Sequence, residues 1–192
     1  MISLAVFASG SGTNFQSIVD STKSGSLSAT VKVLICDKKE ARVIERAKAE
    51  GIPAIVLTLK EFPSKIEYEQ AILTQLKQYE IEWVILAGYM RLIGETLLHA
   101  YEGRIINIHP SLLPAFPGKN AIQQAFQAKV KITGVTVHFV DEGMDTGPII
   151  DQESIRIEDQ DTYESLQNKI QCIEHVLYPK TIQALVTRGH HL

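Results

Sequence analysis

Short apolar runs alternate with helix-like segments along the first part of the chain. The apolar runs cover residues 2–7, 31–36, 54–57, 83–87 and 104–108. Each has the length and composition of a buried strand. The segments between them, with amphipathic or helix-favouring composition, cover residues 15–19, 41–50, 64–79 and 94–101. This alternation, with nearly continuous apolar strands, predicts a parallel sheet covered by helices on both faces.

The second part of the chain departs from this alternation. A helix is predicted over residues 121–128, followed by strands at 133–140 and 149–157. Because the loop between these strands is too short for a helical crossover, they are predicted to pair antiparallel. A last helix over 162–187 is predicted to be capped by Asp161. The fold class is therefore α/β: a Rossmann-like, mostly parallel twisted sheet with helices on both faces and a C-terminal antiparallel extension.

Composition and charge restrict the functional class. The 192 residues, 45% hydrophobic and 21% charged, are typical of one ordinary globular domain. The formal net charge is −3 without a strongly basic block, so a nucleic-acid partner is not expected. No apolar run approaches the ~18–20 residues of a membrane span. The N-terminus has no Lys or Arg before Lys23, so a signal peptide is not expected and a cytoplasmic location is predicted.

The two cysteines do not suggest a metal site. Cys36 falls in a predicted strand and Cys172 in the last predicted helix, far apart and without metal-ligand spacing. Both are predicted to be reduced core thiols.

One stretch combines a strand end, polar side chains and prolines. Residues 107–114 read Asn-Ile-His-Pro-Ser-Leu-Leu-Pro, and Pro117 follows. Proline restricts its own φ and favours an extended predecessor, which predicts a stiff loop after the strand. Alternation places Asn107 and His109 on the same side of the strand, at the end where α/β proteins keep their sites. A loop histidine bonded only to backbone is the alternative for His109.

A glycine turn separates the first strand from the first helix. Residues 10–14 read Gly-Ser-Gly-Thr-Asn, and a turn of small residues at a helix N-terminus favours an anion. The dinucleotide fingerprint requires glycine where Phe15 stands, and the phosphate-loop pattern requires a Gly-Lys-Ser/Thr that is absent. The turn predicts binding of a single phosphate, as on a ribonucleotide; a tight turn that needs glycine is the alternative.

An acidic loop over residues 141–148 joins the last two predicted strands. Asp145 has a glycine two positions away on each side. If Asp145 reaches His109, its charge favours the protonated imidazole. Asp141 and Glu142 have the pattern of a solvated surface, and the loop lacks the alternation of a calcium site.

The remaining polar residues are less informative. His138 is interpreted as either a core residue or a residue that supports the site, and Arg91 as a ligand clamp or a solvated loop charge. No Ser or Cys is paired with a histidine as a nucleophile. An imidazole, an amide and a carboxylate are left, a set that suits direct acyl transfer, in which charge develops on a carbonyl oxygen.

Several motifs, taken in order and spacing, resemble one enzyme family. They are residues 9–14, 87–91, 107–114, 116–118, 141–145 and 147–148. Over essentially its whole length the chain resembles the folate-dependent phosphoribosylglycinamide formyltransferases, also called glycinamide ribonucleotide transformylases. The Asn-x-His-Pro-Ser-Leu-Leu-Pro motif with its downstream Asp is specific for folate-dependent formyltransferases, and the glycine turn together with the lack of extra domains narrows the resemblance to this member.

The resemblance implies a reaction. The formyl group of 10-formyltetrahydrofolate would pass to the amine of phosphoribosylglycinamide (GAR), in de novo purine biosynthesis, directly through a tetrahedral intermediate. His109 would be the general acid, Asn107 would bond the formyl oxygen, and Asp145 would keep His109 charged. Another folate-dependent formyltransferase, a formyltetrahydrofolate hydrolase and a non-catalytic nucleotide-binding module are the alternatives.

The resemblance also implies binding residues and an organisation. For GAR they are Gly12, Thr13, Asn14 and Glu174. For 10-formyltetrahydrofolate they are Lys65, Met90, Arg91, Leu92, Ile93, Asn107, Asp141 and Asp145. Where this chain has Lys65 the family often has Arg, and Lys cannot make a bidentate fork. The chain is expected to be a single domain, 1–192, with a phosphate-binding part at 1–100 and a catalytic and folate-binding part at 101–192. Its partners would be two small molecules, with no metal, nucleic acid or membrane, and the protein would be a monomer or homodimer.

Overall fold

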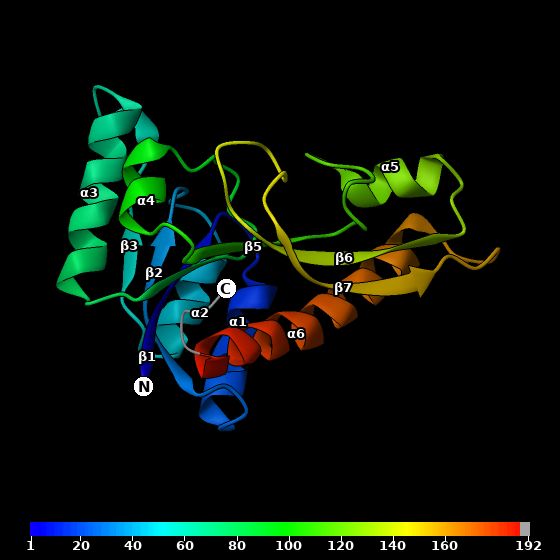
Figure 1. Cartoon of the computed structure of the whole chain (residues 1–192), viewed down its shortest axis with the longest axis horizontal. Helices are drawn as coiled ribbons and strands as arrows, with labels where there is room; N and C mark the ends of the chain where they lie inside the picture. Colours follow the sequence, from blue (N-terminus) through cyan, green and yellow to red (C-terminus); the bar gives the residue numbers. More distant parts are fainter. Residues whose placement is uncertain (189–192) are drawn as a thin grey trace.

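The computed structural model describes residues 1–188, which contain one seven-stranded sheet with helices on both faces (Figure 1). The strands are β1 (Ile2–Ala8), β2 (Ala29–Cys36), β3 (Ala54–Val56), β4 (Trp83–Leu86), β5 (Ile105–His109), β6 (Ile132–Phe139) and β7 (Ile149–Arg156). The helices are α1 (Thr13–Lys23), α2 (Val43–Ala49), α3 (Lys65–Gln78), α4 (Glu95–Ala100), α5 (Ala121–Gln127) and α6 (Tyr163–Arg188), with a 3₁₀ turn at Leu59–Glu61.

The strand order is β3-β2-β1-β4-β5-β6-β7. In this order each strand pairs parallel with the next as far as β5. The strand β6 pairs antiparallel with both β5 and β7. The predicted fold class, including its antiparallel extension, is confirmed. The chain order changes direction between β1 and β4, and such a switch point leaves a crevice beyond the carboxyl ends of the strands.

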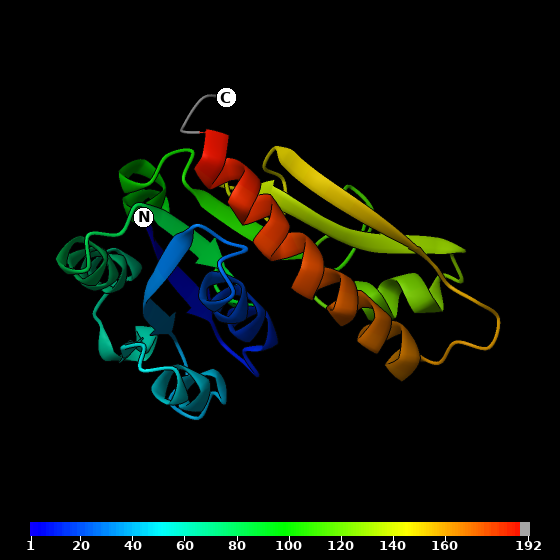
Figure 2. The same ribbon diagram turned by 90° about the horizontal axis from the view of Figure 1, so that it is seen from below.

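Two apolar cores lie on opposite faces of the sheet, because side chains along a strand alternate between faces. In β1, Leu4 and Val6 join the core under α1, α2 and α6, while Ala5 and Phe7 join the core under α3 and α4. Figure 2 shows α6 crossing one face as a long diagonal helix. The buried hydroxyl of Tyr178 ties α6 to the sheet, since it donates to the carbonyl oxygens of Leu86 (2.8 Å) and Ile106 (3.2 Å).

Two details of α6 differ from the sequence-based expectation. The predicted cap was Asp161, but the Thr162 hydroxyl accepts the Ser165 N–H (3.1 Å), while Asp161 accepts the Ser165 hydroxyl (2.8 Å) and pairs with Lys169. The prediction that Cys172 is a core thiol is also wrong, because the solvent-facing side of α6 carries it; Cys36 is buried as predicted.

The described residues contain no helix that combines the length and the apolar character required to cross a membrane. The predicted domain range extends to residue 192, and residues 189–192 lie outside the described part.

The buried Thr136 hydroxyl fastens the proline loop to the sheet. It donates to the Ser111 carbonyl (2.7 Å) and accepts the Leu113 N–H (3.0 Å) and the Gln152 amide (2.9 Å). Thr136→Val leaves the Ser111 carbonyl and the Leu113 N–H without this partner, so the free energy of unfolding should fall by about 1–3 kcal/mol. Urea denaturation measures the change. Thr74→Val, which removes an exposed helical hydroxyl, should change it by less than about 0.5 kcal/mol; equal losses in the two variants would contradict the assignment.

Candidate active site

A cleft of about 550 Å³ opens at the switch point, beyond the carboxyl ends of β1, β4 and β5. Both parts of the chain line it. Its walls are residues 10–14, 86–93, 107–110 and 118–122, with further side chains from β6, the 140–145 loop and α6. The glycine turn, the proline loop and the acidic loop therefore meet around one space.

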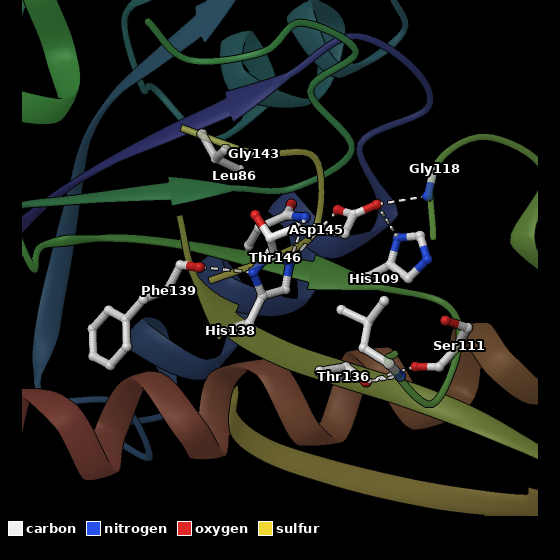
Figure 3. A network of polar contacts seen from close by, with 12 residues as sticks. Leu86, His109, Ser111, Gly118, Thr136, His138, Phe139, Gly143, Asp145 and Thr146 are labelled. Carbon is white, nitrogen blue, oxygen red and sulfur yellow. Dashed lines mark hydrogen bonds and ion pairs between the residues drawn. The ribbon is translucent and has the colours of Figure 1, made fainter. Parts of the chain in front are cut away.

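His109 and Asp145 lie against each other at the floor of this cleft (Figure 3). Their atoms Nδ1 and Oδ2 are 3.4 Å apart, and both side chains are largely buried. The Nε2 atom of His109 lies 2.9 Å from the carbonyl oxygen of Phe116. Because that oxygen can only accept, Nε2 carries a proton. Both ring nitrogens thus face acceptors, an arrangement that only the doubly protonated imidazolium satisfies.

The Asp145 carboxylate is stabilised from several sides. The Gly118 N–H donates to its Oδ2 (2.8 Å), and His138 Nε2 lies 3.6 Å from its Oδ1. The polar contact with His138, the Gly118 N–H and the charge of His109 lower the pKa of Asp145 below its usual value, while burial opposes them. Asp145 itself has φ +57°, a left-handed conformation that aims its side chain inward from the loop.

Asn107 and His138 lie directly opposite each other in the β5–β6 ladder. The Asn107 Nδ2 atom is 3.2 Å from His138 Nε2, and His138 Nδ1 is 2.7 Å from the Phe139 carbonyl oxygen. That oxygen can only accept, so Nδ1 carries a proton, and Nε2 lies between the amide of Asn107 and the carboxylate of Asp145. Asn107 has a second N–H, which this contact leaves free for the cleft.

The glycine turn borders the cleft at the N-terminus of α1. Gly12 has φ +74°, and a Cβ there would press against Val43, so glycine is required both for conformation and for space. No side chain caps α1, which begins at Thr13. The first N–H groups of a helix lack partners within it and attract anions.

Glu174 reaches the same end of the cleft from α6. Its Oε2 accepts the Asn14 amide at 3.0 Å, so Asn14 holds this carboxylate as well as bordering the turn. Burial raises the pKa of Glu174, and the Asn14 hydrogen bond opposes the rise. Within residues 1–188, Asn14 Oδ1 is buried without a hydrogen-bond partner, which leaves an acceptor for a ligand.

The residues predicted for the formyl donor fall into two groups. Met90 and Leu92 are 61% and 51% exposed at the cleft, whereas Ile93 is buried in the core under α3 and α4. The Arg91 Nε lies 2.8 Å from the buried Asp37, while the Arg91 side chain is 31% exposed at the edge of the cleft. Lys65 lines a smaller adjoining hollow of about 240 Å³.

Asp141 is exposed at the rim of the cleft. Its carboxylate accepts the N–H of Gly143 (3.0 Å) and the hydroxyl of Thr146 (2.6 Å), and these bonds shape the loop that carries Asp145. Within the part of the chain that the structure describes, no three His, Cys, Asp or Glu residues are placed to hold a metal ion.

Comparison with known proteins matches residues 2–182 to the formyl transferase family. The chain belongs to this family. It is 54% identical to the phosphoribosylglycinamide formyltransferase of Bacillus subtilis, over 97% of this chain and 95% of that protein.

Solved structures agree with this assignment. The crystal structure of phosphoribosylglycinamide formyltransferase from Bacillus halodurans superimposes with a TM-score of 0.95 at 57% identity, covering 99% of this chain and 98% of that one. Glycinamide ribonucleotide transformylase 1 from Geobacillus kaustophilus gives a TM-score of 0.93 at 59% identity, with coverages of 96% and 98%.

In this formyl transferase the structure gathers Asn107, His109 and Asp145, as the sequence predicted they would lie. His138, which the sequence left open, belongs with them. The feature that places His138 in the site is the register of β5 and β6, which sets it opposite Asn107 and is known only from the structure.

Proposed function

We propose that this chain transfers the formyl group of 10-formyltetrahydrofolate to the amine of phosphoribosylglycinamide in purine biosynthesis. The observation that carries the proposal is the buried His109–Asp145 contact beside Asn107. It lies in a cleft that is also bordered by the glycine turn at residues 10–14, which is suited to bind a phosphate. Similarity to the formyltransferases of Bacillus subtilis and Bacillus halodurans supports it.

The chemistry follows from charge. The substrate amine attacks the formyl carbon, and the carbonyl electrons move onto the oxygen. The free N–H of Asn107 and the positive ring of His109 stabilise that oxygen. The His109–Asp145 contact of 3.4 Å is longer than the ~2.7–2.9 Å of a charge-assisted hydrogen bond. The intermediate collapses when the carbonyl re-forms and the bond to the folate nitrogen breaks. The Nδ1 proton passes to that nitrogen, and the proton released by the attacking amine restores the charged ring beside Asp145.

Residues around the cleft support the binding of both substrates. Met90 and Leu92 offer an exposed apolar surface at the side where a flat heteroaromatic ring would lie. The N–H groups at Gly12 and Thr13 would bind the phosphate, and Asn14 with Glu174 would bind the ribose or amine side. Ile93 would contribute through its backbone, because its side chain is buried, and Arg91 borders the cleft while paired with Asp37.

We also propose that the chain works as one cytoplasmic domain with two small-molecule partners. The continuous seven-stranded sheet supports a single unit. The division into a phosphate-binding part (1–100) and a folate-binding part (101–192) is not strict, because Met90 and Glu174 each line the cleft from the opposite part.

A turnover assay tests the function. Purified protein is mixed with phosphoribosylglycinamide and 10-formyltetrahydrofolate, and the change in folate absorbance is followed. Formyl transfer that requires the amine is expected. Loss of the formyl group without the amine would favour a hydrolase, and no reaction together with ribonucleotide binding would favour a non-catalytic module.

Glu174→Gln should raise the KM for the amine substrate by ~10-fold, because a neutral amide replaces a charged acceptor. Burial raises the pKa of Glu174, so its charged form appears only as the pH rises. The wild-type KM for this substrate should therefore fall as the pH rises above the usual titration range of Glu, and the variant should lose this dependence. Initial rates measure both. Glu164→Gln, an exposed neighbour on α6, is the control; a wild-type KM in Glu174→Gln would refute the role.

A further inference from the structure

The segment 88–94, between β4 and α4, forms one wall of the cleft without helix or strand structure of its own. Met90 and Leu92 project from it and are 61% and 51% exposed. A segment without its own hydrogen-bond ladder keeps its shape only through bonds to other elements. Two buried carboxylates that take no part in the chemistry above supply those bonds.

Asp37, at the end of β2, holds the beginning of the segment. It is 3% exposed, and its Oδ1 accepts the Ser9 hydroxyl at 2.5 Å. The same hydroxyl accepts the Met90 N–H at 2.9 Å, and the Ser9 N–H donates to the Gly88 carbonyl at 3.1 Å. The other carboxylate oxygen, Oδ2, lies 2.8 Å from Arg91 Nε. Asp37 therefore fixes the backbone of one residue and the side chain of the next.

Glu69, on α3, holds the other end. It is also 3% exposed, and its Oε1 accepts the Gly94 N–H at 2.6 Å. A Cβ at Gly94 would crowd both carboxylate oxygens, so the segment fits closely against this acid. Lys65, one turn earlier on α3, lies 3.8 Å away as a counter-charge.

The side chain of Arg91 packs beside two tyrosines where it pairs with Asp37. Its guanidinium carbon lies 5.9 Å from the centre of the Tyr68 ring, and the Tyr68 hydroxyl is 2.6 Å from that of Tyr89. If Arg91 turned outward to bind a ligand, the buried Asp37 would lose its cationic partner. A buried carboxylate without its counter-ion is strongly unfavourable. Arg91 is therefore held at Asp37, at the edge of the cleft.

We propose that Asp37 and Glu69 are positioning residues that hold segment 88–94 in the shape that receives the formyl donor, with Arg91 as the counter-ion of Asp37. The inference rests on the proposed function, which supplies the identity of the donor. Asp37 and Glu69 lie outside the cluster of Asn107, His109 and Asp145, and they would determine how well the formyl donor binds. Substitution of either acid should therefore weaken binding of the formyl donor and leave binding of the amine substrate unchanged.

Steady-state kinetics of Asp37→Asn test this role. Loss of a hydrogen bond to a charged group corresponds to a KM for 10-formyltetrahydrofolate raised by ~10-fold or more. The KM for the amine substrate should stay within ~2-fold of wild type and the kcat at saturation within ~3-fold. Both changes are smaller than the ~10-fold rise expected in the KM for the donor. Asp159→Asn removes an exposed acid paired with Lys131 and should match wild type. A lower KM for the donor in Asp37→Asn would show that Arg91 is a donor ligand restrained by Asp37, and would overturn the proposal.

Amide hydrogen exchange provides a readout that does not depend on turnover. In Asp37→Ala, which removes the acceptor of the Ser9 hydroxyl, the Met90 amide should exchange faster while the Gly94 amide keeps its wild-type rate, and Glu69→Ala, which removes the acceptor of the Gly94 N–H, should show the reverse. Ser9→Ala removes the Met90 acceptor but keeps the Asp37–Arg91 pair, so it serves if Asp37→Ala does not fold. Unchanged exchange in these variants, or an unchanged KM for the donor, would refute the positioning role. Absence of turnover in the wild type would refute the proposed function instead and leave the exchange result standing.

Discussion

Replacing His109 with Asn should lower kcat by ~100-fold or more, the size of effect expected for loss of a general acid. The variant keeps a polar side chain but loses the positive charge and the proton that the ring holds between Phe116 and Asp145. The formyl oxygen then lacks a cationic partner, and the departing nitrogen lacks its proton donor. Because these interactions strengthen in the transition state, kcat should fall more than either KM rises.

The control for this experiment is His99→Asn. His99 is exposed on α4, away from the cleft residues, so its replacement should leave kcat unchanged. Thermal unfolding of both variants verifies that they are folded. If folded His109→Asn retained most of its turnover, the imidazole would have no part in the reaction.

Replacing Asp145 with Asn should also lower kcat by ~100-fold or more, because the charge that keeps His109 protonated is lost. The amide oxygen can still accept the Gly118 N–H, so the loop should keep its position. Asp159→Asn provides a matched control, since its exposed side chain pairs only with Lys131 among the contacts of residues 1–188. Wild-type turnover in the Asp145 variant would contradict the role of the carboxylate.

The pH dependence of the wild type follows from the same contact. The pKa of Asp145 is lowered by the contact with His138, by the Gly118 N–H and by the charge of His109. A carboxylate with a lowered pKa stabilises the fold above its unfolded-state pKa and loses this contribution as the pH falls through the folded value. The stability difference between wild type and Asp145→Asn should therefore persist to acid pH and disappear only below the usual range of Asp. Urea denaturation as a function of pH measures it.

The predicted order of the elements followed from hydrophobic pattern alone. The apolar runs at 2–7, 31–36 and 83–87 became β1, β2 and β4, because strands buried on both faces carry almost no polar residues. The antiparallel pairing of β6 with β7 followed from the short connection between them. Only the ends of elements moved by a few residues, where local bonds such as the Thr162 cap decide the boundary.

The site could be predicted only in part. Asn107 and His109 share a strand, and strand alternation already places them together. The approach of Asp145 depends on its left-handed backbone and on the close passage of Gly147 past Phe139, and the flanking glycines gave only a hint of this. His138 gave no signal before the register of β5 and β6 was known.

The supporting acids could not be predicted from the sequence. Asp37 follows an apolar strand and Glu69 lies in a helix, so each has the pattern of an ordinary polar residue. Their partners, Ser9 and Gly94, come from other elements that the fold brings alongside. The same contacts pair Arg91 with Asp37, a partner that its place in the sequence did not suggest.

The most direct measurement is the protonation of His109 itself. Long-range proton–nitrogen NMR spectra of protein with ¹⁵N-labelled histidine, recorded near pH ~7, distinguish the charged ring from either neutral tautomer. We expect both His109 nitrogens to carry protons in the wild type and one of them to lose its proton in Asp145→Asn. A neutral His109 ring in the wild type, or spectra that the Asp145 substitution leaves unchanged, would contradict the account.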